Sequence, residues 1–159
     1  MKVFNHIYTE IEKRLREEFG PKPYIAKDYG PRKDLPQVPF IGIEAVSIDP
    51  ARPPGTGEQE LLSRWEIRLV ISQQQPNPKI FARDAMTRIA SLLDDQVLGP
   101  QCYPAKFTGA FDDNIDHYIP NESWVAEFEI IFRCGKDNWE KWEFYPETAI
   151  KSEDVISGA

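Results

Sequence analysis

The sequence predicts an α+β protein, a two-layer sandwich in which two helices cover one face of a mainly antiparallel four-stranded sheet. Two stretches repeat apolar residues at helical spacing, two long stretches alternate apolar with polar residues, and Gly-Pro pairs or proline-rich segments separate them. The expected order is helix, strand, strand, helix, strand, strand. We expect residues 1–135 to form a single domain and residues 136–159 to form a C-terminal aromatic arm with a polar tail.

The first helix is expected from about Val3 to Phe19. Charged residues occupy the opposite side from its apolar stripe, which is typical of a helix that packs on a core. Gly20-Pro21 should end it, because glycine adopts the left-handed cap conformation and proline cannot continue a helix. The apolar stripe consists of Phe4, Ile7, Tyr8, Ile11, Leu15 and Phe19.

Residues 21–39 are rich in proline, so we predict irregular structure there, without a central strand or helix. A strand should follow from about Pro39 to Ile48. The segment Asp49–Gly57 combines prolines with glycines and should be a loop between strands that is mobile or docks on a partner.

The next strand is expected from Leu62 to Ser72, where large apolar residues alternate with charged ones. A second helix should begin at Asn77-Pro78, since asparagine suits the N-cap and proline the first helical position. We expect Gly99-Pro100 to stop it. Its predicted core stripe is Phe81, Ala85, Ile89, Leu92 and Leu93.

Two strands complete the predicted sheet, at about Ala105–Phe111 and at Trp124–Cys134. In the second, every other residue is apolar, so it should have one dry face and one mixed face. Glu66 with Glu127 or Glu129 should lie on the outer face, where a charged ladder between strands or between subunits is favoured over a catalytic pair.

The acidic loop before the last strand invites a metal-site hypothesis. Asp112, Asn114 and Asp116 follow the first spacings of a calcium loop, but His117 replaces the required glycine and Ser123 the required glutamate. A site made by Asp112, Asp113, Asp116 and His117 remains the weaker alternative to a solvated acidic turn. We expect no metal, no cofactor and no catalytic residue, because neither a nucleophile elbow nor a phosphate loop is present.

The composition argues against several further classes of protein. The net charge is −7 and no basic stripe is present, which argues against gripping nucleic acid through its phosphates. No apolar run is long enough to span a membrane, and the N-terminus has no signal-peptide core, so a cytosolic protein is expected. The two cysteines match no metal or redox spacing and are expected to be buried thiols rather than a disulfide.

The C-terminal arm carries four aromatic residues within seven positions. Two readings stay open at even weight: the arm folds back over its own domain, or it packs against a neighbouring subunit, because aromatic residues anchor interfaces. The candidate interface residues of the arm are Trp139, Trp142, Phe144 and Tyr145.

This arrangement resembles the tail terminator, or tail-completion, proteins of tailed bacteriophages, such as the lambda minor tail protein U and Mu-like tail proteins. The resemblance covers about residues 1–135. It rests on the short helix ending in Gly-Pro, the proline-rich link, and the strand pair Phe40–Ile48 and Leu62–Ser72 with its long loop. The helix Lys79–Leu98 and the acidic loop leading into Trp124 complete it.

The resemblance implies a structural virion protein located in the tail and assembled in the host cytoplasm. Such a protein forms a homo-oligomer, a hexameric ring that caps the tail tube, stops its polymerisation and offers a surface for head attachment. Its partners would be tube and sheath proteins and neck or head-completion proteins. DNA would pass through an acidic lumen without being bound.

Under this reading, Asp112, Asp113 and Asp116 are candidate lumen residues, and Arg52 and Pro54 are candidate contacts with a subunit or with tube or neck proteins. Two alternatives stay open. One is another ring component of a phage, such as a neck or head-completion protein. The other is a small-ligand-binding protein or enzyme on a similar sheet, which would need a pocket with convergent polar groups.

Overall fold

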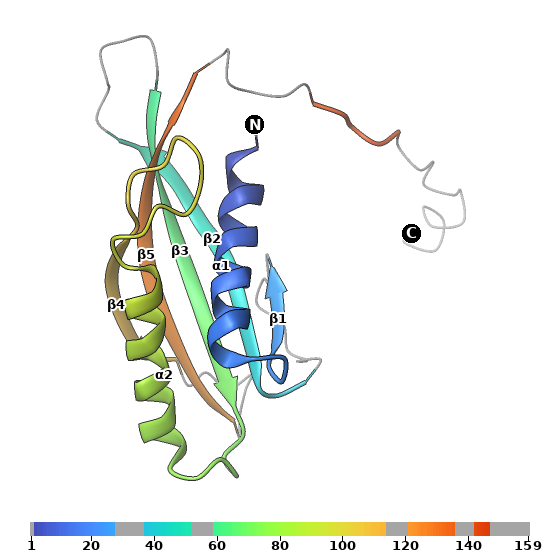
Figure 1. The fold of residues 1–159 in the computed structure, drawn as a ribbon, viewed down its shortest axis with the longest axis vertical. Helices are drawn as coiled ribbons and strands as arrows, with labels where there is room; N and C mark the ends of the chain where they lie inside the picture. Colours follow the sequence, from blue (N-terminus) through green and yellow to red (C-terminus); the bar gives the residue numbers. More distant parts are fainter. Residues whose placement is uncertain (1, 28–36, 52–58, 114–120, 136–141, 147–159) are drawn as a thin grey trace, which may run out of the picture.

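The computed structural model describes residues 2–27, 37–51, 59–113, 121–135 and 142–146. Both helices lie on one face of a single sheet, so the predicted two-layer α+β class is confirmed (Figure 1). The described part has five strands, one more than the sequence predicts. The elements are α1 (Val3–Phe19), β1 (Tyr24–Lys27), β2 (Phe40–Pro50), β3 (Gln59–Ile71), α2 (Pro78–Leu93), β4 (Lys106–Asp112) and β5 (Glu122–Cys134).

The strand order across the sheet is β1-β2-β3-β5-β4. Adjacent strands are antiparallel except β1 and β2, which are parallel. The helix α1 lies over β1 and β2, whereas α2 lies over β5 and β4 (Figure 1). The opposite face of the sheet carries no helix among the described residues, and we call it the open face.

The strand β1 corrects the expectation that residues 21–39 are irregular. It is short and lies at the sheet edge, and the Tyr24 N–H donates to the carbonyl oxygen of Pro39 at 3.0 Å. Prolines exclude a central strand because they cannot donate a ladder hydrogen bond, but they are compatible with an edge strand that lies between them. The prolines correctly exclude a central strand here, but the expectation of irregular structure throughout residues 21–39 was wrong.

The helix α1 has the predicted bounds, and the predicted stop explains its end. Gly20 has a φ of +76°, and its N–H donates to the carbonyl oxygen of Arg16. The Arg16 guanidinium then donates to the carbonyl oxygens of Gly20 and Pro23 at 3.0 and 2.7 Å. These bonds direct the chain into β1. The fully buried residues of α1 are Val3, Ile7, Ile11 and Leu15.

The helix α2 begins at Pro78 as predicted, but Asn77 is not a side-chain cap. Asn77 has a φ of +48° and makes no capping hydrogen bond with its side chain. Phe81, placed on the core stripe by the sequence, is 41% exposed. The face that packs on the sheet is rotated slightly, and its buried residues are Ala82, Ala85, Met86, Ile89 and Leu93.

The prediction that α2 continues to Gly99-Pro100 is wrong. The backbone becomes extended at Asp94, and the Asp95 N–H donates to the Ala105 carbonyl oxygen at 2.7 Å. The Ala105 N–H in turn donates to Gln96 at 2.8 Å. Gly99 marks instead a close approach, because an added Cβ would lie 3.2 Å from Ile7 of α1. A tertiary contact, not a local stop signal, sets the end of this helix.

The core lies between the helices and the alternating apolar faces of β3 and β5, as predicted. Phe4 of α1 stacks on Trp65 with ring centroids 5.5 Å apart, and it meets Phe132 of β5 edge-on. The indole N–H of Trp65 donates to the Ser63 hydroxyl, which donates to the Ile130 carbonyl oxygen, both at 2.8 Å. The polar side-chain atoms of Trp65 and Ser63 at this buried centre are therefore hydrogen-bonded.

Candidate functional site

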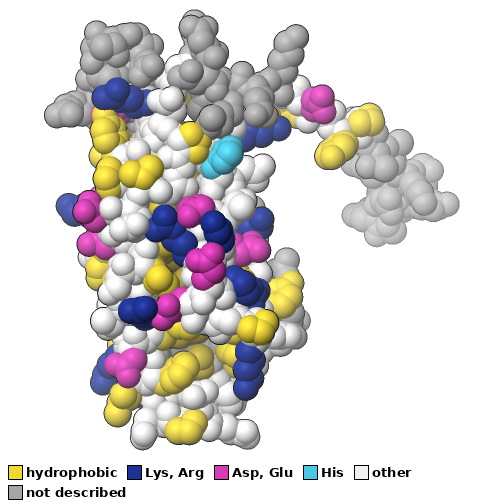
Figure 2. Space-filling model, viewed as in Figure 1, with side chains coloured by type: hydrophobic (Ala, Val, Ile, Leu, Met, Phe, Trp, Pro, Cys, Tyr) yellow, Lys and Arg dark blue, Asp and Glu magenta, His cyan; other side chains and the backbone are white. Residues whose placement is uncertain are grey.

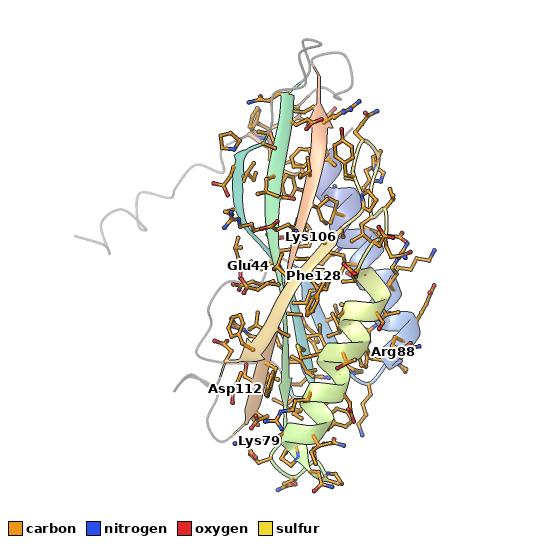
Figure 3. The ribbon with its side chains drawn as sticks, turned by 90° about the vertical axis from the view of Figure 1, so that its left-hand side faces the viewer. Glu44, Lys79, Arg88, Lys106, Asp112 and Phe128 are labelled. Carbon is orange, nitrogen blue, oxygen red and sulfur yellow. The ribbon has the colours of Figure 1, made fainter. Side chains whose placement is uncertain are left out.

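At its centre the open face of the sheet carries charged residues where the helix-covered face carries apolar ones, whereas nearer one end Phe40 and Val70 form a small separate buried apolar cluster on it. Figure 3 shows Glu44 on the side away from the helices, whereas Phe128 points into the space between sheet and helices. This follows from strand alternation, which sends successive side chains to opposite faces. On the outer surface of the helices, acidic and basic side chains are interspersed, and no basic stripe is seen (Figure 2).

Three glutamates form a row across the centre of the open face. Glu44 of β2 is paired in register with Glu66 of β3, and Glu66 is paired with Glu127 of β5. The sequence predicted Glu66 on the outer face with Glu127 or Glu129; the register selects Glu127, and the inclusion of Glu44 was not predicted. Like charges directly opposite one another destabilise a sheet, so this row does not serve folding.

The pKa of the Glu66 carboxyl is raised above its ordinary value of 4.5. Burial is the largest cause; the nearby Arg68 guanidinium opposes it, and the charges of Glu127 and Asp113 add to the rise. The Glu66 carboxyl is therefore more readily neutral, or paired with a cation, than the carboxyl of an ordinary exposed glutamate.

Arg68 sits between two acidic groups at one side of the row. It contacts the Asp113 carboxylate at 2.9 Å and the Glu66 carboxylate at 3.8 Å. The Asp113 side chain is only 16% exposed. This candidate lumen residue therefore faces the Arg68 guanidinium more than solvent. Asp112 is an exposed residue at the end of β4, and Asp116 lies outside the described residues.

Beyond the glutamate row the charges alternate in sign. Arg64 of β3 is in register with Glu129 of β5, and Glu129 is in register with Lys106 of β4. Arg64 also lies 3.6 Å from the Asp49 carboxylate. The central part of the open face thus carries charges of both signs.

An apolar groove lies at the outer edge of the sheet, and sequence reasoning missed it. The strand β1 pairs only with Phe40–Ile43, so among the described residues the outer side of β2 continues without a strand partner to Pro50. The groove beside this edge has a volume of about 640 Å³. We call it the edge groove; its lining includes Phe4 and Tyr8 of α1, Lys27 of β1, and Ala45, Val46 and Ile48 of β2.

A β-bulge creates the apolar rim of the edge groove. The pairing of β2 with β3 shifts between Ala45 and Ser47, so the apolar phase of the strand changes there. Val46 and Ile48 are left 44% and 55% exposed. The Tyr8 hydroxyl accepts a hydrogen bond from the Ala45 N–H at 2.8 Å. The sequence signal was the switch from odd to even apolar positions after Ala45.

The described part of the aromatic arm, residues 142–146, exposes its apolar side chains. Trp142 is 65% exposed, Phe144 86% and Tyr145 97%. The rings of Trp142 and Phe144 stack with centroids 6.4 Å apart, and the ammonium of Lys2 lies 5.3 Å from the Trp142 ring centroid. Trp139, Arg52 and Pro54 lie outside the described residues.

The structure offers little for metal or thiol chemistry in the part of the chain that it describes. There, no group of three or more His, Cys, Asp and Glu side chains is arranged to hold a metal ion. Cys102 and Cys134 are free thiols, each partly exposed rather than fully buried as expected. Burial raises the pKa of Cys102 to about 11, so this thiol is a poor nucleophile.

No helix of the described residues is both long and apolar enough to cross a membrane. A second hollow, of about 530 Å³, lies at the other end of the domain between the C-terminal end of α1 and the start of α2. Phe19, Pro39, Ile71 and Phe81 are among its mainly apolar lining residues. Neither hollow shows the convergent charged groups that a catalytic pocket would need.

Comparison with protein families and with curated proteins finds no match for this sequence. Comparison with solved structures does find matches. One is a chain from the virion of a native gene transfer agent particle, with a TM-score of 0.56 and 12% sequence identity. The alignment covers 84% of this chain and 98% of that chain. At this identity the likeness shows a shared fold.

Proposed function

We propose that this protein is a structural component of a phage-type virion and acts as a tail terminator, a ring that caps the tail tube, stops its polymerisation and provides the head-attachment surface. One observation carries the proposal: a chain of a gene transfer agent virion shares the fold over nearly its whole length. The ring, its hexameric state and its place in the tail are the finer parts of the proposal.

The surfaces of the domain support assembly. Within the described residues, the sheet has one face without helices, a partly uncovered edge at β2 and a second edge at β4. Exposed strand edges and faces are liabilities for a monomer, and neighbours in a closed ring can cover them. The charged open face and the apolar edge groove would then meet different partners.

A ring around DNA also needs a lumen that does not hold the nucleic acid. The net charge of −7 and the absence of a basic stripe fit passage without binding. Asp112 is the described candidate for a lumen position because it is exposed at the end of β4. Asp113 contributes less to such a surface, since its carboxylate already contacts Arg68.

The test uses the full chain and the tail-tube protein of the same particle. Light scattering after size separation, with electron microscopy, should show rings or a reversible oligomer at micromolar concentration. Added to polymerising tube protein, the chain should shorten the tubes and appear at their ends. A chain that stays monomeric and leaves tube length unchanged would overturn the proposal. A ring that does not bind tubes would favour the neck or head-completion alternative.

A further inference from the structure

Two exposed apolar features lie at the same end of the domain. The edge groove lies beside the first turns of α1. Residues 142–146 run near the same end of that helix (Figure 1), and the Lys2 ammonium lies over the Trp142 ring. Apolar surfaces of this kind are buried in the functional state of most proteins.

We propose that residues 142–146 of the aromatic arm of one copy bind to a second copy of the chain, running along the stretch of β2 beyond its pairing with β1 and placing Trp142 and Phe144 in the edge groove. The inference rests on the proposed function, because it supplies a contact between neighbouring subunits of the ring. It names both halves of that contact, which the proposed function does not.

The geometry of an extended segment suits this placement. In a strand, residues two apart point to the same side, so Trp142 and Phe144 face one way and Glu143 the other. The two rings already stack on each other in this manner. When a strand adds to a sheet edge, backbone hydrogen bonds give affinity, and alternate side chains enter pockets.

The receiving edge has the matching features. From Glu44 to Pro50, β2 has no strand on its outer side among the described residues, although β1 pairs with the preceding part. The aromatic rings of Phe4 and Tyr8 border the groove on one side, and Val46 and Ile48 border it on the other.

The direction of the arm favours a second copy over the chain's own groove. After Trp142, the exposure of the side chains rises to 86% at Phe144 and 97% at Tyr145. Figure 1 shows this segment leading away from the sheet and helices. Tyr145 follows Gly135 by ten positions in the sequence. An extended chain spans up to roughly 3.5 Å per residue, so the arm can reach an adjacent domain.

A photo-crosslinking experiment tests the contact directly. The full chain carrying Phe144→p-benzoyl-phenylalanine is prepared without isotope labelling. It is mixed with ¹⁵N-labelled chain of the natural sequence. After irradiation of the oligomer, we expect crosslinks that join the arm of one isotope to the peptide containing Ala45–Ile48 of the other. Crosslinks confined to one isotope, or to any other surface of the second copy, would overturn the inference.

Two surface variants measure the contribution of the contact. Phe144→Ala and Ile48→Glu should each weaken association by about tenfold or more, as expected for residues at the centre of an interface. Ile80→Glu is the matched control, because Ile80 is 57% exposed and Ile48 is 55% exposed. Thermal unfolding of the dilute chains checks that all three variants fold.

The outcomes separate the two proposals. If Phe144→Ala and Ile48→Glu associate as strongly as the natural chain and the Ile80→Glu control, the arm does not occupy the edge groove, and the ring proposal stands. If the natural chain itself neither associates nor caps tubes, the proposed function fails as well.

Discussion

The two faces of the sheet are built from the same strands but obey different rules. On the helix-covered face, Trp65 and Ile67 alternate inward and are almost fully buried. On the open face, Glu66 lies between them in sequence and is paired with two other glutamates. The first face is optimised for folding. The second keeps a like-charge row that opposes folding, so it is available for contacts outside the domain.

The largest expected effect comes from opening the covered face. Trp65→Ala should lower the free energy of unfolding by about 3–5 kcal/mol, because it removes a large buried ring and leaves a cavity. Urea unfolding of the dilute chain measures this loss. The same substitution at Trp142, which is 65% exposed, should change the stability of the monomer little. Equal losses would mean that the arm is part of the folded core.

A smaller effect is expected from a polar link inside the same face. Ser63→Ala removes the acceptor of the Trp65 indole N–H and the donor to the Ile130 carbonyl oxygen. A buried donor without a partner costs about 1–3 kcal/mol. Ser63→Thr keeps the hydroxyl and should recover part of the loss, although its extra methyl group must fit. A serine that can be replaced by alanine at no cost would contradict the role assigned to this bond.

On the open face, removing a side-chain charge should raise the free energy of unfolding instead of lowering it. Glu66→Gln removes one charge from the row and should raise the free energy of unfolding at neutral pH by a few tenths to about 1 kcal/mol. Glu129→Gln is the matched control, because Glu129 faces Arg64 and Lys106. That control should be neutral or slightly destabilising.

The pH dependence of this gain follows from the raised pKa of Glu66. The folded chain holds the Glu66 proton to higher pH than the unfolded chain, so ionised Glu66 destabilises the fold above its folded pKa. That cost disappears as the pH falls through the folded pKa towards the ordinary value of 4.5. The advantage of Glu66→Gln should therefore shrink in the same window. A gain that is constant with pH would mean that charge is not its cause.

The smallest structural disturbance is a chemical probe of Cys102. With its pKa raised to about 11, this thiol should react with a disulfide reagent at pH 8 roughly a hundredfold more slowly in the fold than in urea. The reaction rate in both conditions, with the modified site assigned by mass, gives the comparison. Fast modification in the folded chain would place Cys102 outside the covered layer.

The parts of the fold that sequence predicts best are those with local causes. The bounds of α1 follow from its periodicity and from Gly20, and the faces of β3 and β5 follow from strict alternation. The end of α2 was missed because the backbone bonds between Asp95, Gln96 and Ala105 are tertiary. The strand β1 was missed because four residues between prolines carry little periodic signal.

The candidate site shows the same division. Alternation predicted that Glu66 lies on the outer face with Glu127 or Glu129. The choice of Glu127 depends on the register between β3 and β5, and the inclusion of Glu44 on the register between β2 and β3. The edge groove depends on where β1 stops, which no local pattern indicates. The roles of the arm and of the acidic loop stay predictions, as does the division at residue 135.

The bulge at Ala45–Ser47 divides β2 into two parts with different freedom to change. Substitutions before it alter residues such as Ile41 and Ile43, which are held by the helices. Substitutions after it alter Val46 and Ile48 at the rim. A lineage can thus exchange one binding partner for another by altering the second part, while the first part continues to specify the domain.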